Sequence, residues 1–362
     1  MILHRYIARR FAAAFLAILA TFFLLTFFIE LIEQARRHSD EAGFVALVEL
    51  SLLALPGTLY ELLPIVAILA TVTLFIGLAR SSELVVTRAS GRSALRALVA
   101  PVLVTLVLGA AALAVLNPLS AATAREYEAR TMALTGTTPV QALAEGGLWL
   151  RQGGAEGQSV IHAGRASLDG TELSDVSFLT YAAGDRPVER LRAEEARLVP
   201  GAWELAGVKR WPLDAPNPEA ASEVLATLSL PSSLTADSIR DSFGTPASIP
   251  IWELPRFISE LRAAGFSARR HLVHLQLELA TPLFLVAMVL IGALFTMRHQ
   301  RGGRTGMMIL FAILLGFATY FVRNFARVLG ESGDIPAGLA AWAPPAAAIA
   351  LALGFILHLE DG

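Results

Sequence analysis

The chain has 362 residues, of which 55% are hydrophobic and 17% are charged, and its net charge at pH 7 is −2. A water-soluble domain usually has about 25% charged residues, so this composition excludes an ordinary soluble protein. The balanced charge excludes the basic stripe that a nucleic-acid partner needs, and the absence of cysteine excludes disulfides and thiolate sites. The charged residues gather in the middle of the chain, which predicts membrane helices on both sides of a water-soluble insert.

Three membrane spans are predicted before the insert. The first runs from Phe11 to Ile32, the second from Leu55 to Ala79 and the third from Leu95 to Leu116. Each has close to the ~20 residues that cross ~30 Å of hydrocarbon. Cationic residues precede the first span as in a signal peptide, but its apolar run is too long and no small-residue cleavage site follows. We therefore expect it to remain as a membrane helix.

The insert is expected to be a β domain. Its short segments are rich in β-branched and aromatic residues and are separated by Gly, Pro and Asp. These segments read "GLWLRQ", "QSVIHAG", "LSDVSFLTYAAG", "VERLRAEEARLV" and "GAWELAGVKRW". Strands without a long helix between them predict a β-sandwich or jelly roll, with Trp149, Phe178 and Trp203 as candidate interior residues. A helix from Ile249 to Gly265, capped by Ser248, is predicted to lead back to the membrane.

Three further spans are predicted at Leu279–Met297, Met307–Phe325 and Leu339–Leu359, which gives three spans on each side of the insert. Arginines concentrate before the first span, after the second and after the fourth, all on one side if the spans alternate. They are Arg5, Arg9, Arg10, Arg80, Arg88, Arg92, Arg96, Arg298, Arg301 and Arg304. This side is expected to be the cytoplasm, with both termini there and the insert outside.

The sequence thus predicts an α+β membrane protein with three parts. Residues 1–119 hold the first three spans, residues 120–265 the external β domain with its return helix, and residues 266–362 the last three spans.

Motifs for catalysis are missing from the sequence. The stretch "RGGRTG" lacks the lysine of a nucleotide-binding loop and does not follow a strand, so we expect no nucleotide hydrolysis by this chain. There is no H-E-x-x-H and no G-x-S-x-G. We therefore predict no catalytic residue, no metal site and no cofactor.

Two carboxylates at membrane depth, Glu61 and Glu278, are candidate functional residues, because a charge in hydrocarbon is costly. The favoured interpretation places both at the outer interface or in a wet cavity. The alternative is an intramembrane enzyme that uses one of them.

The stretch "RSSELVVTRASGRS", residues 80–93, predicts a short amphipathic helix on the cytoplasmic side. Ser81 or Ser82 can cap it, Glu83 suits its first turn and Gly91 can end it. One interpretation is an interfacial helix whose arginines meet anionic lipid. The other is a docking element for a soluble partner, with Glu83 as an ionic contact. The residues alone leave both open.

This stretch resembles the coupling helix of the LptF/LptG permeases, the membrane subunits of the lipopolysaccharide exporter. Further resemblances follow in the family's order over nearly the whole chain, and the ordered set is specific although each motif alone is weak. They are "LHRYIARRF", "GGLWLR" and "LPRFISELRAAG" followed by "ARRHLVHLQLELATPL". The "SELVV…ASG" pattern is closer to the LptG branch than to the LptF branch. The alternatives are the LptF branch, a permease of another lipid or lipoprotein exporter, and a structural scaffold.

The resemblance implies a permease subunit of an ABC-type exporter in the bacterial inner membrane, with a periplasmic β-jelly-roll domain. The implied partners are a sister permease of the LptF type, two copies of the cytoplasmic ATPase LptB, periplasmic jelly-roll proteins of the LptC and LptA type, and lipopolysaccharide. The residues implied to couple to the ATPase are Arg80, Glu83, Leu84 and Arg88.

The resemblance also implies cations that bind the lipid's phosphates. Arg36 and Arg37 match paired cationic positions of the family, just beyond the outer end of the first span. Arg323 and Arg327 lie one helical turn apart at the outer end of the fifth span, and an arginine fork suits phosphate. The alternative is that these arginines only snorkel to the interface. Glu30 and Glu278 stand where family members can carry cations.

Overall fold

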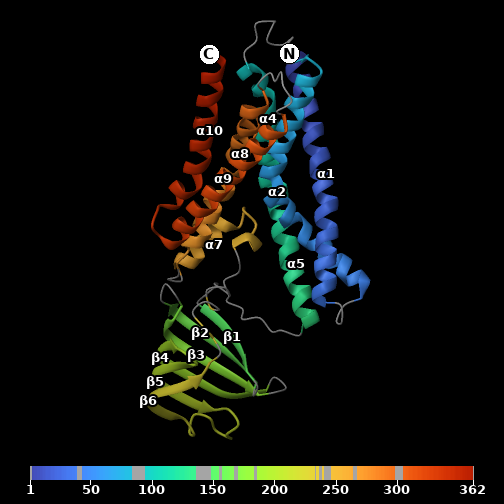
Figure 1. The fold of residues 1–362 in the computed structure, drawn as a ribbon. Coiled ribbons are helices and arrows are strands. Elements are labelled where there is room, and N and C mark those ends of the chain that lie inside the picture. Colours follow the sequence, from blue (N-terminus) through green and yellow to red (C-terminus); the bar gives the residue numbers. More distant parts are fainter. Residues whose placement is uncertain are drawn as a thin grey trace. The chain divides into compact units, whose positions relative to one another are not determined.

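A computed structural model gives the fold (Figure 1). The structure describes residues 2–38, 43–83, 94–135, 148–154, 157–166, 170–182, 186–232, 234–235, 239, 246–263, 267–297 and 305–361. The chain divides into two compact units. The first, helical unit contains residues 1–131, 247–252 and 269–362, and the second contains residues 132–246 and 253–268. Residues 247–252 therefore belong to the helical unit although they interrupt the second unit in the sequence.

Six helical segments in the described ranges are long and apolar enough to cross a membrane. The bounds of the helices are α1 Ile2–His38, α2 Phe44–Arg80, α4 Ala94–Ala111, α5 Asn117–Thr135, α8 Arg269–Thr296, α9 Thr305–Ser332 and α10 Ala337–Asp361. A π-helical stretch, Ala112–Leu116, joins α4 to α5, so that these form the third crossing. The six predicted spans are confirmed, and each helix is longer than its predicted apolar run. The two termini lie at the same end of the helical unit, as an even number of crossings requires (Figure 1).

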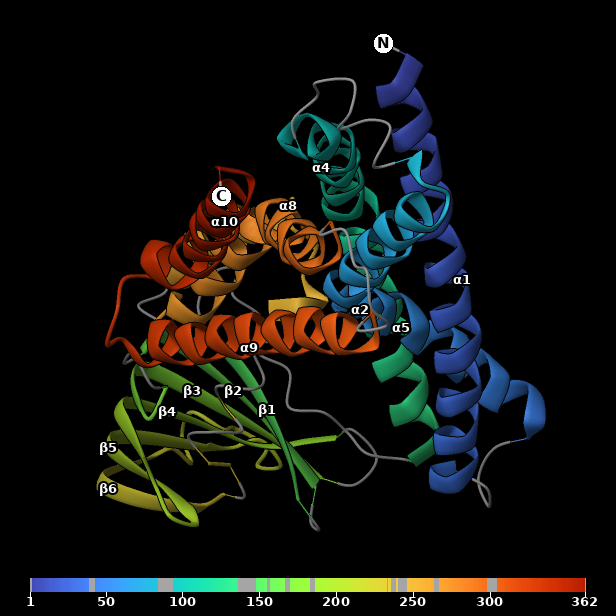
Figure 2. The ribbon, with the colours of Figure 1, turned by 45° about the horizontal axis from the view of Figure 1, so that its top comes forward.

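Helix α8 is the centre of this unit and contacts α2, α4, α9 and α10 (Figure 2). Small residues let the helices approach closely, as is common in membrane bundles. A Cβ on Gly109 of α4 would lie 2.8 Å from the Pro282 Cα of α8. Helices α2 and α8 are mostly buried, whereas few residues of α1 and α9 are buried. The exposed faces of α1 and α9 suit lipid or another membrane helix.

The second unit contains one antiparallel sheet of six strands in sequential order, a meander. The strands are β1 Leu148–Gly154, β2 Gly157–Ala166, β3 Glu172–Ala182, β4 Arg186–Val199, β5 Ala202–Pro212 and β6 Glu223–Pro231. The fold class is confirmed as membrane helices with a β domain inserted between the third and fourth spans. The sequence predicted a β-sandwich or jelly roll. In the described residues, the β domain contains this single meander sheet. Strand β6 was not among the predicted strands.

The sheet has one apolar face, and its largest buried side chains are Phe178 on β3 and Trp203 on β5, with 1% and 0% exposed. Their ring centroids are 6.3 Å apart, although β4 lies between them. Ala193 and Ala196 on β4 are buried and small, which leaves room for the two rings to meet. The interior placement of these two aromatic residues is confirmed.

The prediction that Trp149 is interior is wrong. Its neighbour Leu150 takes the inward position with 1% exposed, so strand alternation turns Trp149 to the other face. There it is 40% exposed and stacks on His162, at 4.3 Å between ring centroids.

The return helix α7, Leu254–Ala263, begins later than predicted. Ser248 ends a 3-10 turn, Pro246–Ser248, and is buried, so it does not cap the helix as predicted. Pro255 lies in the first turn of α7, where its missing N–H leaves no helical hydrogen bond unmade.

Candidate functional site

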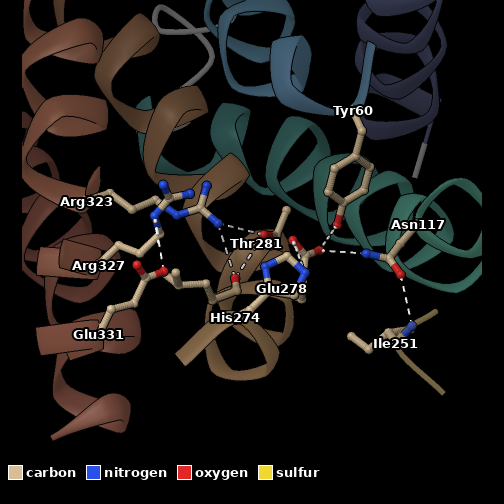
Figure 3. A network of polar contacts seen from close by, with 10 residues as sticks. Tyr60, Asn117, Ile251, His274, Glu278, Thr281, Arg323, Arg327 and Glu331 are labelled. Carbon is tan, nitrogen blue, oxygen red and sulfur yellow. Dashed lines mark hydrogen bonds and ion pairs between the residues drawn. The ribbon is translucent and has the colours of Figure 1, made fainter. Parts of the chain in front are cut away.

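A polar network inside the helical unit surrounds Glu278, which is only 7% exposed (Figure 3). The hydroxyl of Tyr60 on α2 donates a hydrogen bond to Oε2 of Glu278. The amide nitrogen Nδ2 of Asn117, the first residue of α5, donates to the same oxygen at 3.1 Å. A buried carboxylate is tolerated only with such partners. Helices α2, α5 and α8 therefore meet at one oxygen atom.

Asn117 extends the network to the segment that follows the β sheet in the chain. Its Oδ1 accepts a hydrogen bond from the backbone N–H of Ile251 at 3.1 Å, and Asn117 itself is 7% exposed. Because Ile251 lies within residues 247–252, this contact is internal to the helical unit.

Arg323 and His274 lie beside this carboxylate. Nη2 of Arg323 donates to the Leu277 carbonyl at 3.2 Å and to the Thr281 hydroxyl at 3.0 Å, both on α8. Its guanidinium carbon is 4.5 Å from the ring centre of Phe284, a cation–π contact. Nε2 of His274 is 3.9 Å from Oε1 of Glu278. Arg323 therefore points into the helical unit and attaches α9 to α8.

The two arginines predicted to share a face of α9 have different surroundings. Arg327 is exposed, and its Nε lies 3.6 Å from Oε1 of Glu331, whereas Arg323 is turned toward α8. The two acidic candidates differ as well, because Glu278 is buried and Glu61 is exposed on α2.

Near the C-terminal end of α1, Glu33 forms ion pairs with two predicted phosphate-binding residues. Its carboxylate accepts hydrogen bonds from Nε and Nη2 of Arg36 at 3.1 and 2.9 Å, and from Nε of Arg37 at 2.7 Å. The side chains of Arg36 and Arg37 are still 75% and 59% exposed. Each guanidinium therefore has further N–H groups that face outward.

Only part of the predicted ATPase-coupling stretch lies in the described ranges. Arg80 ends α2 and is exposed, while Leu84 and Arg88 lie outside the described residues. Glu83 Oε1 accepts a hydrogen bond from Arg10 Nη1 of α1 at 3.0 Å. The hydrogen bond with Ser81, together with the Arg10 guanidinium, holds the pKa of Glu83 below its ordinary value. Glu83 is therefore a charged group at neutral pH.

The sequence did not predict Tyr60, Asn117 or Thr281 as site residues. Their signal was weak, since each is a polar residue within or next to an apolar run and each contacts a residue far away in the chain. No group of three or more His, Asp or Glu side chains in the described ranges is arranged to hold a metal ion.

Comparison with known proteins identifies the family. The family model for the lipopolysaccharide export system permease LptF/LptG matches residues 5–358, and thus both the helices and the sheet. Two similar proteins are the lipopolysaccharide export system permease proteins LptG of Escherichia coli strains K12 and O6:H1. Each is 24% identical over 372 residues, which covers 99% of this chain and 98% of the relative. Since the match spans nearly the whole chain, this multi-pass membrane protein belongs to the LptF/LptG family of lipopolysaccharide export permeases.

Proposed function

We propose that the chain is the LptG-type permease of an ABC-type exporter, which extracts lipopolysaccharide from the inner membrane and passes it to a periplasmic bridge. The full-length match to the family carries this proposal. A separate cytoplasmic ATPase of the LptB type, present in two copies, supplies the energy, because the sequence has no nucleotide-binding loop. A sister permease of the LptF type completes the membrane part.

The proposed orientation places both termini in the cytoplasm and the β sheet in the periplasm. The arginine-rich loops support it through the positive-inside rule. The sheet then delivers the lipid to periplasmic jelly-roll proteins of the LptC and LptA type, and an edge strand of an antiparallel sheet suits strand addition by such a partner.

The ATPase is proposed to act at the end of α2, through Arg80, Glu83, Leu84 and Arg88. The observation in support is that Glu83 keeps its charge and is 38% exposed beside an exposed Arg80. Movement of this end passes directly into α2, which is buried among the other helices. A packed interface with two stable arrangements can convert such a small displacement into a change of the lipid cavity.

Arg36, Arg37 and Arg327 are proposed to bind the phosphates of the lipid. All three are exposed near the C-terminal end of their helix, α1 or α9. Their guanidinium groups can make paired charge-assisted hydrogen bonds to phosphate. Arg323 is turned toward α8, where its Nη2 donates to the Leu277 carbonyl and the Thr281 hydroxyl. We propose that Arg323 positions α9 against α8 and does not contact the lipid.

Depletion of this protein in its own cell tests the proposal. Lipopolysaccharide is expected to accumulate in the inner-membrane fraction and to return to the outer membrane when the chain is supplied again. Normal arrival of lipopolysaccharide at the outer membrane would contradict the proposed function. The Glu61→Gln variant should restore export, whereas an intramembrane enzyme that uses Glu61 would lose its activity.

A further inference from the structure

Two residues of the network lie one helical turn before a proline of their own helix. Tyr60 precedes Pro64 by four residues in α2, and Glu278 precedes Pro282 by four residues in α8. Proline has no N–H, so in each helix the carbonyl four residues earlier loses its helical hydrogen bond and the helix can bend there. The Tyr60–Glu278 hydrogen bond therefore joins α2 and α8 at the point in each helix where proline removes a backbone hydrogen bond.

The third residue lies at an irregular turn of another kind. Asn117 directly follows the π-helical stretch Ala112–Leu116, between α4 and α5. Such π-helical turns widen the helix, interrupt its regular hydrogen bonds and often occur at functional positions. All three crossings that meet at Glu278 thus have an interruption of the regular helical hydrogen bonds at the level of the network.

Other buried hydroxyl groups of the helices behave differently. Ser51, Thr71 and Thr105 each donate to the carbonyl four residues earlier in their own helix. Their hydrogen bonds connect no two helices, whereas both bonds to Glu278 Oε2 cross between helices. This contrast separates the network from ordinary satisfaction of buried polar groups.

The network reaches the chain segment that leads to the second unit. Asn117 holds the N–H of Ile251, and Glu253, two residues further on, belongs to the second unit. In the other direction, α2 runs from Tyr60 to Arg80, the end at which the ATPase is proposed to act. One continuous path of covalent and hydrogen bonds therefore connects the end of α2 with the start of the return segment.

We propose that Glu278 is a positioning residue that makes α2, the α4–α5 crossing and α8 bend together. The joint movement carries displacement of the α2 end to residues 247–252, and so to the attachment point of the β domain. This inference rests on the proposed function, in which a partner moves the end of α2. The competing explanation is a static brace, in which the network only holds the helices together.

Spin-label distances in the full complex with its ATPase, in lipid nanodiscs, separate these explanations. The chain has no native cysteine, so single labels can be placed cleanly. One pair, Thr73→Cys with Leu357→Cys, reports the α2 end, and a second pair, Trp252→Cys with Leu339→Cys, reports the return segment. All four positions are exposed in the helical unit. Distances are compared without nucleotide and after trapping with ATP and vanadate.

Trapping is expected to shift both distances in the unmodified network. In Tyr60→Phe, which removes only the hydroxyl, trapping should still change the distance of the Thr73–Leu357 pair. The distance of the Trp252–Leu339 pair should no longer change. Lipopolysaccharide release per ATP should fall roughly tenfold or more, as for the loss of one hydrogen bond to a charged group. Glu278→Gln keeps an acceptor oxygen and should retain both shifts. Thr105→Val is the matched control, because its hydroxyl bonds only to its own helix.

Three outcomes would overturn the inference. If trapping changes the Trp252–Leu339 distance in both Tyr60→Phe and Asn117→Ala as much as in the unmodified protein, the network does not transmit movement. If both variants fail to form a folded complex, the network is a static brace. If trapping does not change the Thr73–Leu357 distance in the unmodified complex, the proposed action of the ATPase on α2 fails as well. This outcome distinguishes failure of the proposed function from failure of the network alone.

Discussion

At the scale of single residues, the structure shows how the surroundings of a charge decide its role. Glu278 and Glu33 are both acidic residues within membrane-crossing helices. Glu278 is buried, and its donors come from two other helices. Glu33 is bound by two arginines of its own helix that remain exposed. The first arrangement fixes neighbouring helices, and the second leaves cations available to an incoming anion.

The paired arginines of α1 give the first prediction. Arg36→Ala and Arg37→Ala are each expected to weaken binding of lipopolysaccharide about tenfold, because each loses charge-assisted hydrogen bonds to phosphate. Glu33→Gln should strengthen binding, since it removes the carboxylate that competes for both guanidinium groups. Binding to the purified complex in detergent measures both effects. Unchanged affinity in the double arginine variant would show that these residues only mark the interface.

Glu83 gives the second prediction, because it has a partner in its own chain. Glu83→Ala is expected to abolish the stimulation of ATP hydrolysis by the permease in the purified complex. Arg10→Ala removes the ion-pair partner that Glu83 has on α1 and should keep most of that stimulation. Equal loss in the two variants would mean that Glu83 acts only through α1, and full stimulation in Glu83→Ala would exclude it as a coupling residue.

Two tryptophans of the sheet, Trp149 and Trp203, give the third prediction. Trp203→Ala leaves a cavity beside Phe178 and is expected to destabilise the β domain by about 3 to 5 kcal/mol. Trp149→Ala, on the exposed face, should cost about 1 kcal/mol or less, mainly for its stacking on His162. Hydrogen exchange of the β5 amides in the full-length protein compares the two variants. Similar exchange in both would contradict the one-sided core.

At the scale of elements, local sequence patterns predicted what depends on local physics. The six spans follow from apolar runs of sufficient length, and the predicted strands from alternation between turn residues. Strand β6 was missed because it lacks a clear alternation, with six of its nine side chains exposed and no buried one. The start of α7 was misplaced because Ser248 resembles a cap, while Pro255 shows where the helix begins.

Close contact between helices gives the prediction at this scale. Gly109→Ala would place a methyl group 2.8 Å from the Pro282 Cα, where the backbone cannot move aside cheaply. We expect a loss of about 1 to 3 kcal/mol as α4 is pushed from α8. Gly354→Ala is the control, since no atom lies within 4 Å of its Cβ position. Thermal unfolding in detergent should separate the variants, and equal melting temperatures would contradict this packing.

At the scale of the whole molecule, the sequence could predict the six apolar helices, the inserted β domain and the family, but not the network around Glu278. Tyr60, Asn117 and Glu278 are far apart in the sequence, and no periodicity links them. Glu278 alone was recognisable, as a carboxylate in an apolar helix. Its partners are set by the packing of three crossings, which only the folded structure reveals. The same limit applies to Arg323. The sequence predicted it as a phosphate-binding residue and could not predict its hydrogen bonds to α8.

The most direct measurement of the central claim uses the complex of this chain with its sister permease and ATPase, reconstituted in vesicles that contain lipopolysaccharide. Transfer of the lipid to a soluble periplasmic jelly-roll protein is followed after ATP is added. We expect transfer that requires ATP and stops when the ATPase carries a variant that cannot hydrolyse it. Transfer at the same rate without ATP, or no transfer in a complex that hydrolyses ATP and binds lipopolysaccharide, would contradict the account.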